Sequence, residues 1–299
     1  MRIGFVGLGK MGQNMTKRLL EQHEVVVFDI NKEALEEAKK NGAIAASSIK
    51  ELISEMQDPK IVWMMVPAGK ITDQTIEAIS NNLTERDILI DGGNSFYKDS
   101  IRHADNLKKK KIKFLDIGTS GGVWGLKEGY CLMVGGDEIA FKQIEPILKT
   151  LSNNDSYNHM GKSGSGHFVK MVHNGIEYAL MQAYAEGFEL LKAKKDFDLD
   201  LHKISKLWNN SSVVRSWLLE LIENIFKKDQ TLNNIKGFVE DSGEGRWTVK
   251  EAIDLGVPTP VINQSLMERF SSRQVDAFQD KILASLRDAF GGHGVNKGE

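Results

Sequence analysis

The chain has 299 residues, of which 41% are hydrophobic and 27% are charged, and its formal net charge at pH 7 is −2. This size and composition indicate a globular protein with two domains of about 150 residues each. The nearly balanced charge argues against a protein that binds nucleic acid or an anionic membrane surface through its overall field.

Short β-rich runs alternate with helical patterns through about residue 160, with expected strands at residues 2–6, 24–29, 61–66, 87–91, 112–117 and 130–134. This alternation predicts an α/β domain of the Rossmann type, a doubly wound parallel sheet covered by helices on both faces. From residue 167 to residue 290 the pattern is helical throughout. We therefore expect a dinucleotide-binding domain over residues 1–162. An all-helical domain for substrate binding and dimerisation follows over residues 163–299, with a glycine-rich tail.

The first expected strand runs into FVGLGKMG, whose spacing is G-x-G-x-x-G: Gly7, Leu8, Gly9, Lys10, Met11 and Gly12. Between a strand and a helix, these glycines allow a tight turn and let the backbone approach a pyrophosphate. The second expected strand ends at Asp29, where an acid binds the ribose hydroxyls of NAD. The structural alternative for Asp29 is a helix cap. With the glycines in place, the sequence predicts a dinucleotide site.

Two further loops follow expected strands at the same carboxyl edge, where open α/β sheets bind ligands. Val66, Pro67 and Ala68 are expected to pass near the cofactor. Asn94 stands behind two glycines in DGGNS and is suited to bridge nicotinamide and substrate, or alternatively to form an Asx turn.

The segment GTSGGVWG contains a hydroxyl followed by two glycines, at Ser120, Gly121 and Gly122. Exposed backbone N–H groups beside a hydroxyl can hold a carboxylate. The alternative is a mobile glycine loop without a ligand.

A polar face is predicted on the helix that contains GHFVKMVHNGIEY. Lys170, His173, Asn174, Glu177 and Tyr178 have the spacing i, i+3, i+4, i+7 and i+8, which places them on one side of a helix. A lysine there can act as a general base if burial or a nearby cation lowers its pKa. Its structural alternative is a salt bridge with Glu177. Several functional polar groups on one face favour a site.

These motifs together resemble the 6-phosphogluconate dehydrogenase family in its shorter bacterial form, within the wider β-hydroxyacid dehydrogenases. The resemblance runs nearly end to end and rests on GLGKMGQNM, DGGNS, TSGGVWG, GHFVKMVHNGIEY, VVRSW and LRDAFGGH. It implies oxidative decarboxylation of 6-phospho-D-gluconate to D-ribulose 5-phosphate and CO2 with reduction of NAD, in the pentose phosphate pathway and gluconate utilization. No metal is expected.

The resemblance also implies a role for each matched residue. Lys170 would be the general base and Glu177 the general acid. The substrate's carboxylate and hydroxyls would be held by Asn94, Ser120, Gly121, Gly122, His173 and Asn174. Its phosphate would be bound by Tyr178, Arg215 and Arg287, with His293 at the same end. For an isolated arginine, surface ion pairing is the alternative.

The cofactor preference is predicted from Asp29-Ile30-Asn31 after the second strand, where NADP-using members of the family carry an Asn-Arg-Thr-type run. A carboxylate at Asp29 would repel the 2′-phosphate of NADP. We therefore expect NAD to be preferred over NADP.

The expected assembly is a homo-oligomer, a dimer or a tetramer, with Arg287 and His293 acting in their own or a neighbouring subunit. No segment reaches the ~20 apolar residues of a membrane span, the start of the chain does not resemble a signal peptide, and the single cysteine excludes an intrachain disulfide. These features predict a cytoplasmic protein with no membrane or nucleic-acid partner. Two alternatives stay open: another β-hydroxyacid dehydrogenase such as 3-hydroxyisobutyrate dehydrogenase, and a non-catalytic NAD-sensing protein.

Overall fold

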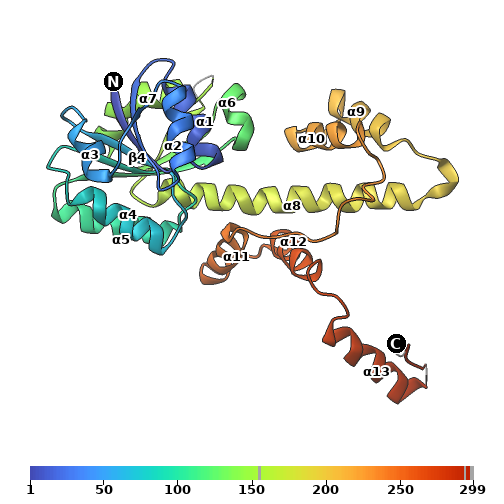
Figure 1. Cartoon of the computed structure of the whole chain (residues 1–299). Helices are drawn as coiled ribbons and strands as arrows, with labels where there is room; N and C mark the ends of the chain where they lie inside the picture. The colour runs from blue at the N-terminus through green and yellow to red at the C-terminus, as the bar shows by residue number, and fades with distance from the viewer. Residues whose placement is uncertain (154–155, 293, 297–299) are drawn as a thin grey trace. The chain divides into compact units, whose positions relative to one another are not determined.

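The computed structural model describes residues 1–153, 156–292 and 294–296 (Figure 1). Packing divides the chain into two compact units, Met1–Asn174 and Gly175–Glu299. The long helix α8 (Ser165–Ala193) contains the division. Across the residues that the structure describes, none of the helices combines the length and the apolar composition that a membrane span requires.

Eight strands form one sheet in the first unit: β1 (Arg2–Val6), β2 (Glu24–Phe28), β3 (Ile44–Ala45), β4 (Ile61–Met64), β5 (Ile88–Asp91), β6 (Lys113–Ser120), β7 (Cys131–Gly136) and β8 (Tyr157–Gly161). Their order in the sheet is β3-β2-β1-β4-β5-β6-β7-β8. The strand order reverses between β1 and β4, which is where doubly wound sheets bind ligands at their carboxyl edge.

The expectation of an all-parallel sheet is wrong at one place, because β6 and β7 are antiparallel. The connection between them contains only a 3-10 turn (Gly122–Trp124) and the short helix α6 (Gly125–Glu128). A parallel return would need a crossover of about a dozen residues or more, usually with a longer helix. Since the connection is short, β7 runs back beside β6.

The remaining helices of the first unit are α1 (Lys10–Leu19), α2 (Lys32–Lys40), α3 (Ile49–Ser54), α4 (Lys70–Ser80), α5 (Tyr97–Lys109) and α7 (Glu138–Leu151). Successive residues of a strand pack into two different clusters of buried hydrophobic side chains. Along β4, Trp63 belongs to one buried cluster, whereas Val62 and Met64 belong to another. Because side chains alternate along a strand, both faces of the sheet are buried. The predicted doubly wound architecture is confirmed.

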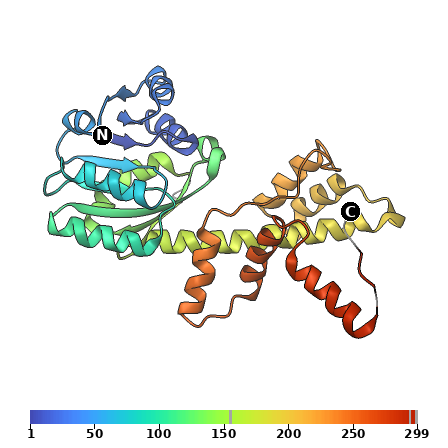
Figure 2. The ribbon, with the colours of Figure 1, turned by 60° about the horizontal axis from the view of Figure 1, so that its bottom comes forward.

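The described residues of the second unit form helices joined by turns and loops, with no strand among them, as expected. It contains the later part of α8, a 3-10 turn (Lys195–Phe197), α9 (Leu201–Ser211), α10 (Trp217–Phe226), α11 (Glu244–Asp254), α12 (Pro260–Ser271) and α13 (Phe278–Gly291). Within this unit, α9 and α10 lie on one side of α8, and α11 and α12 lie on the other (Figures 1 and 2). A small core of Phe188, Leu201, Leu219 and Phe226 joins α8 to α9 and α10.

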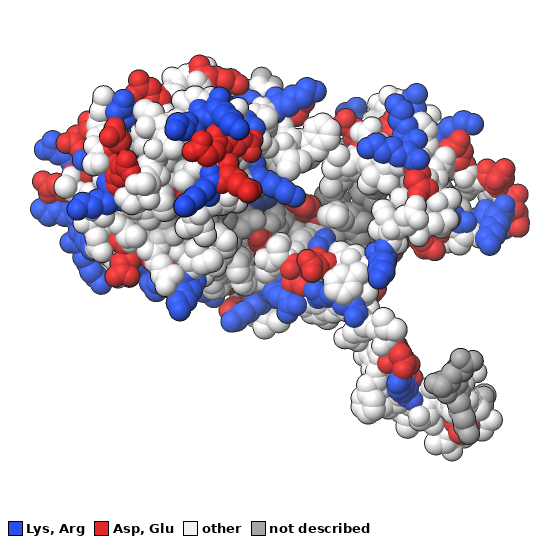
Figure 3. All heavy atoms as spheres, viewed as in Figure 1, with Lys and Arg blue, Asp and Glu red and all other residues white. Residues whose placement is uncertain are grey.

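Basic and acidic side chains are interspersed over the described residues of the face drawn in Figure 3. This mixture agrees with the net charge of −2. On that face, charge alone therefore does not indicate a binding surface.

Candidate active site

The glycine-rich turn lies between β1 and α1. Gly7 has a φ of 97°, and a Cβ there would collide with the carbonyl oxygen of Met65, so only glycine fits. The N-cap of α1 is Gly9, and no side chain caps that helix. Its first N–H groups therefore have no side-chain cap, and uncapped helix N-termini of this kind bind phosphates. The rest of the motif follows in the turn and the start of α1: Leu8, Lys10, Met11 and Gly12.

Asp29 follows β2 and contacts the glycine turn directly. One carboxylate oxygen accepts the backbone N–H of Leu8 at 2.5 Å, and the other accepts that of Asn31 at 2.7 Å. The side chain of Asn31, not that of Asp29, caps α2. The helix-cap alternative for Asp29 is therefore wrong. A carboxylate has further lone pairs, so Asp29 can still accept hydrogen bonds from a ribose.

The loop after β4 lies between the glycine turn and the loop after β5. The side chain of Val66 packs beside Gly7, and its carbonyl oxygen lies beside Gly93. Pro67 and Ala68 are exposed in the same loop. The structure therefore brings together the three segments predicted to surround the cofactor.

The DGGNS loop is fixed by a buried carboxylate. Asp91 is fully buried and accepts the backbone N–H of Gly93 at 3.1 Å, which is an Asx turn. The hydroxyl of Thr119 on β6 donates to the carbonyl of Gly92 at 3.5 Å, which joins this loop to the next strand. Asn94 is exposed at the tip of the loop. Its side chain is thus presented at the carboxyl edge by a rigid turn.

Lys170 is buried on α8, with 7% of its surface exposed. Its Nζ donates to the Oδ1 of Asn174 at 2.7 Å and lies 3.4 Å from the Nδ1 of His173. Its side chain packs against β6 at Gly118, where a Cβ would overlap the lysine. Three predicted site residues of the helix face, Lys170, His173 and Asn174, therefore contact one another. Of these, Lys170 packs against the sheet.

Ser120 ends β6 on the same face of the sheet as Lys170. It stands two residues beyond Gly118, so the two residues share a face, and it pairs with Cys131 of β7. Partial desolvation holds the pKa of the Cys131 thiol above its ordinary value, against the opposing charge of Lys170. Gly121 and Gly122 follow at the start of the loop.

In the second unit, the side chains of Tyr178 and Arg269 contact each other. Tyr178 is buried, and its hydroxyl accepts the backbone N–H of Ser242 at 3.2 Å. The guanidinium of Arg269 on α12 lies 3.5 Å from the ring centre of Tyr178. One of its nitrogens donates to the carbonyl of Glu240 at 2.8 Å. Sequence reasoning missed Arg269, because a single arginine on a helix has no distinguishing pattern.

Arg215 lies elsewhere in the second unit. It is exposed between α9 and α10, and the carbonyl of its neighbour Val214 accepts the hydroxyl of Tyr184. The structure therefore places Arg215 at Tyr184, on the side of α8 that carries α9 and α10, and does not bring it to Tyr178. Arg287 is exposed on α13. The remaining predicted phosphate ligand, His293, lies outside the described residues.

A buried carboxylate orders the segment before α11. The carboxylate of Asp241 accepts hydrogen bonds from the guanidinium groups of Arg246 at 2.6 Å and Arg273 at 2.8 Å, and the side chain of Asp241 is 4% exposed. Hydrogen bonds from Arg246 and Arg273 outweigh burial and hold the pKa of Asp241 below its ordinary value. The segment that includes Ser242 is thereby held near Tyr178.

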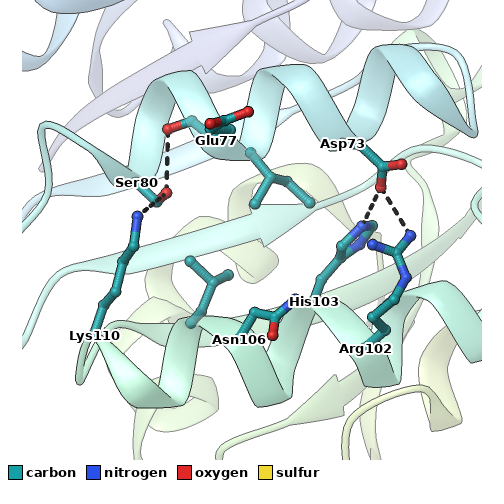
Figure 4. A pocket seen from close by; sticks show the side chains of 9 residues that line it. Asp73, Glu77, Ser80, Arg102, His103, Asn106 and Lys110 are labelled. Carbon is teal, nitrogen blue, oxygen red and sulfur yellow. Dashed lines mark hydrogen bonds and ion pairs between the residues drawn. The ribbon is translucent and has the colours of Figure 1, made fainter.

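A second charged cluster lies in a groove between α4 and α5 (Figure 4). The carboxylate of Asp73 lies 2.6 Å from Nε2 of His103 and 2.9 Å from a guanidinium nitrogen of Arg102. The Arg102 and His103 contacts hold the pKa of Asp73 below its ordinary value. None of the predicted site residues lines this groove, and we interpret the cluster as a link between the two helices. Within the part of the chain that the structure describes, no group of three His, Cys, Asp or Glu residues is arranged to hold a metal.

Two family models cover most of the chain. Residues 2–161 match the NAD binding domain of 6-phosphogluconate dehydrogenase, and residues 166–281 match the 6-phosphogluconate dehydrogenase C-terminal domain. The chain belongs to the 6-phosphogluconate dehydrogenase family. The family, the fold and the class of enzyme predicted from the motifs are thereby confirmed.

Relatives within the 6-phosphogluconate dehydrogenase family include proteins of similar length. A Bacillus subtilis protein, provisionally named as a 6-phosphogluconate dehydrogenase, is 47% identical over 99% of this chain and 100% of its own length. The NAD(+)-dependent, decarboxylating 6-phosphogluconate dehydrogenase of Haloferax volcanii is 46% identical over 99% of this chain and 98% of its own length. The NADP(+)-dependent 6-phosphogluconate dehydrogenase of Bacillus subtilis is 37% identical, but this chain covers only 61% of it.

Solved structures agree with this family assignment. Plasmodium falciparum 6-phosphogluconate dehydrogenase matches all of this chain and 67% of its own, with a TM-score of 0.83 and 29% identity. Mycobacterium tuberculosis 3-hydroxyisobutyrate dehydrogenase matches 96% of this chain and 99% of its own, with a TM-score of 0.74 and 22% identity. At that identity, the second likeness shows the fold alone.

Proposed function

We propose that this chain oxidises and decarboxylates 6-phosphogluconate with NAD, and that Lys170 is the general base. The observation that carries the proposal is the placement of Lys170. It is 7% exposed, its Nζ is held at 2.7 Å by Asn174, and its side chain packs on β6 at Gly118. An amine fixed in this way can exchange a proton at one defined position.

The chemistry assigns the proton transfers to two residues. The glycine turn and Asp29 would hold NAD, which would supply the hydride acceptor for C3 of the substrate. Lys170 takes the proton of the 3-hydroxyl, which leaves a 3-keto acid. The carboxylate β to that ketone departs as CO2, because its electrons pass to the ketone oxygen, which the protonated Lys170 stabilises. Lys170 returns its proton to that oxygen, which gives an enediol. Glu177 then gives a proton to C1 while Lys170 takes the hydroxyl proton, and ribulose 5-phosphate results.

The carboxylate and hydroxyls of the substrate are assigned to polar groups around Lys170. Ser120, with the N–H groups of Gly121 and Gly122, is proposed to bind the carboxylate, since N–H groups in a glycine turn hold anions. His173 and Asn174 contact the Lys170 amine and are proposed to bind the hydroxyls. Asn94 is proposed to contact both the nicotinamide and the substrate.

The substrate's phosphate is assigned to Tyr178, Arg269, Arg287 and His293. Arg269 is added to the residues that the sequence predicted because its guanidinium lies 3.5 Å from the Tyr178 ring centre. A guanidinium suits a phosphate because it donates two parallel hydrogen bonds. Arg215 is the ligand that the sequence predicted, and comparing Arg215→Ala with Arg269→Ala distinguishes the two arginines.

The preferred cofactor is proposed to be NAD. Asp29 lies at the glycine turn, and the next residue, Ile30, is 93% exposed. Because Ile30 is uncharged, this position offers no positive charge to a 2′-phosphate. A like-charge contact in a partly desolvated pocket costs several kcal/mol. The Haloferax volcanii relative is named NAD(+)-dependent, which supports the same preference.

The functional form is proposed to be a homo-oligomer in the cytoplasm, with residues 1–162 binding the cofactor and residues 163–299 binding substrate and the neighbouring subunit. Helix α13 supports the oligomer, because none of its residues is buried. Its exposed apolar side chains recur with helical spacing at Phe278, Ile282, Leu283, Leu286 and Phe290. Such a face requires a partner surface.

The activity is tested by mixing the protein, NAD and 6-phosphogluconate and following NADH and CO2 together. The proposal requires one CO2 for each NADH. If NADH formed from 3-hydroxyisobutyrate but not from 6-phosphogluconate, the result would instead support the alternative that this chain is a 3-hydroxyisobutyrate dehydrogenase. Binding of NAD without either reaction would support the NAD-sensing alternative.

A further inference from the structure

We propose that Asp116 is a positioning residue that fixes Lys170 by anchoring the start of α8. The inference rests on the proposed function, in which Lys170 is the general base. Asp116 is fully buried on β6 and is not among the residues assigned to substrate, cofactor or proton transfer. A buried carboxylate outside the chemistry needs another role, because burying a charge is costly unless it is well bonded.

The carboxylate of Asp116 accepts hydrogen bonds from two backbone N–H groups at the start of α8, one just before the helix and one in its first turn. It accepts Gly164 at 2.6 Å and His167 at 2.9 Å. The first N–H groups of a helix lack partners within that helix. The residue before α8 is Gly164, which has no side chain to cap the helix, so β6 supplies the cap from another element. Its negative charge also complements the helix dipole.

A second buried contact holds the same turn, and it comes from α5. The Nδ1 of His167 lies 2.7 Å from the hydroxyl of Ser100 on α5. His167 is 2% exposed and Ser100 is fully buried. The backbone of His167 is therefore bonded to the sheet through Asp116, and its ring is bonded to α5.

Lys170 follows His167 by one helical turn, so the anchor and the amine belong to one rigid segment. The lysine side chain packs on Gly118, which stands two residues beyond Asp116 on the same strand. Close-packed contacts transmit a displacement, because they leave no room for local adjustment. Weakening the anchor at Asp116 should therefore move the Nζ of Lys170 relative to the loops after β5 and β6.

The test replaces the carboxylate with an amide of the same shape. Asp116→Asn keeps one acceptor oxygen but places an NH2 donor against a backbone N–H. We expect kcat to fall about 10- to 100-fold, as a misplacement of about 1 Å causes, while KM for NAD and for 6-phosphogluconate changes by less than about 3-fold. The kinetic isotope effect with substrate deuterated at C3 should rise, because hydride transfer becomes slower than the other steps.

Asp87 provides a matched control for general loss of stability. It is 1% exposed and likewise accepts two backbone N–H groups, from Lys60 and Thr84, each at 2.7 Å. It precedes β5 and so lies at the amino edge of the sheet, opposite the edge that holds the site. Asp87→Asn should lower the melting temperature but leave kcat and the isotope effect unchanged.

The proposal is overturned if folded Asp116→Asn has the kcat and isotope effect of the wild type, or if Asp87→Asn changes both equally. Should Asp116→Asn not fold, Ser100→Ala removes the second anchor and leaves the carboxylate in place. A raised isotope effect in Ser100→Ala supports the proposal, and an unchanged one overturns it. Lys170→Met distinguishes a failure of the proposed function from a failure of the positioning role. If Lys170→Met stays active, the proposed function is wrong. If Lys170→Met is inactive and Asp116→Asn behaves as the wild type, only the positioning role of Asp116 is refuted.

Discussion

The guanidinium of Arg269 lies 3.5 Å from the centre of the Tyr178 ring, and these two side chains come from α12 and α8. Stacking on the ring fixes the plane of the guanidinium, and its bond to the Glu240 carbonyl fixes one nitrogen. Arg269→Ala should therefore raise KM for 6-phosphogluconate by about 10- to 100-fold, since a hydrogen bond to a charged group contributes about 1.5–3 kcal/mol. Steady-state kinetics at saturating NAD give this value.

Arg215→Ala is the matched comparison, because it removes the same side chain from the arginine that the motif VVRSW suggested. We expect its KM to stay within about 3-fold of the wild type, well below the loss of one charged hydrogen bond. The reverse result, a large effect on KM in Arg215→Ala and none in Arg269→Ala, would identify Arg215, the residue predicted from the sequence, as the phosphate ligand.

The sequence predicted the buried strands well but not the strands at the sheet edges. Runs such as IVWMMV contain only apolar residues because both faces of a central strand are buried. By contrast, β3 has two residues, and β8 has the partly polar sequence YNHMG. Both stand at the ends of the strand order and are only partly covered, so they lack that pattern.

The site was predictable where its chemistry is local in sequence. Lys170, His173 and Asn174 lie within two helical turns, and the structure brings them together. The contact between Tyr178 and Arg269 depends on how α11 and α12 return to α8, which no short spacing encodes. Asp116 was missed for a related reason, because one acid inside an apolar strand does not reveal which helix it will cap.

The cofactor preference is tested at the residues after β2. We expect the unmodified protein to prefer NAD over NADP by at least ~100-fold in kcat/KM, equivalent to about 2.7 kcal/mol. Asp29→Asn with Ile30→Arg and Asn31→Thr should shrink or reverse that ratio. Ile30 is 93% exposed, so an arginine fits there, and a threonine can still cap α2.

The nearest other cation in that segment is Lys32, at the start of α2. Lys32→Ala should leave the ratio of NAD to NADP use unchanged. Equal use of both cofactors by the unmodified protein would contradict the preference, and a loss of NADP use in Lys32→Ala would identify that lysine as a phosphate ligand.

Helix α13 allows a test of the oligomer. Leu283 and Leu286 are 60% and 52% exposed, on the apolar face that we propose is covered by another copy of the chain. Leu283→Glu with Leu286→Glu should lower the mass measured by light scattering to that of a smaller species or a monomer. Ala284→Glu, on the opposite side of the same helix, should not. A monomeric wild-type protein with full activity would refute the oligomer as the functional form.

Acid stability should depend on Asp241. Arg246 and Arg273 hold its pKa below the ordinary value, so the folded state is favoured while the carboxylate is ionised. This contribution is complete above the ordinary pKa of about 3.9 and is lost as the pH falls through the lower folded-state value. The melting-temperature difference between wild type and Asp241→Asn should therefore be largest near neutrality and shrink below about pH 4.

Asp280→Asn on α13 removes the same charge from an exposed position and should show no such pH-dependent difference. A difference between wild type and Asp241→Asn that stays constant down to about pH 2 would show that packing, and not the ionised carboxylate, is responsible.

The assignment of Lys170 and Glu177 as base and acid is tested most directly by one measurement, the simultaneous release of NADH and CO2 from 6-phosphogluconate by wild type, Lys170→Met and Glu177→Gln. Wild type should give equal amounts of both. Lys170→Met should lose both by about 10²–10⁴-fold while still binding the substrate, as removal of a positioned base does. Glu177→Gln should instead impair chiefly the protonation of the enediol. If Lys170→Met kept more than about a tenth of wild-type turnover, or if wild type released NADH without CO2, the assignment would be contradicted.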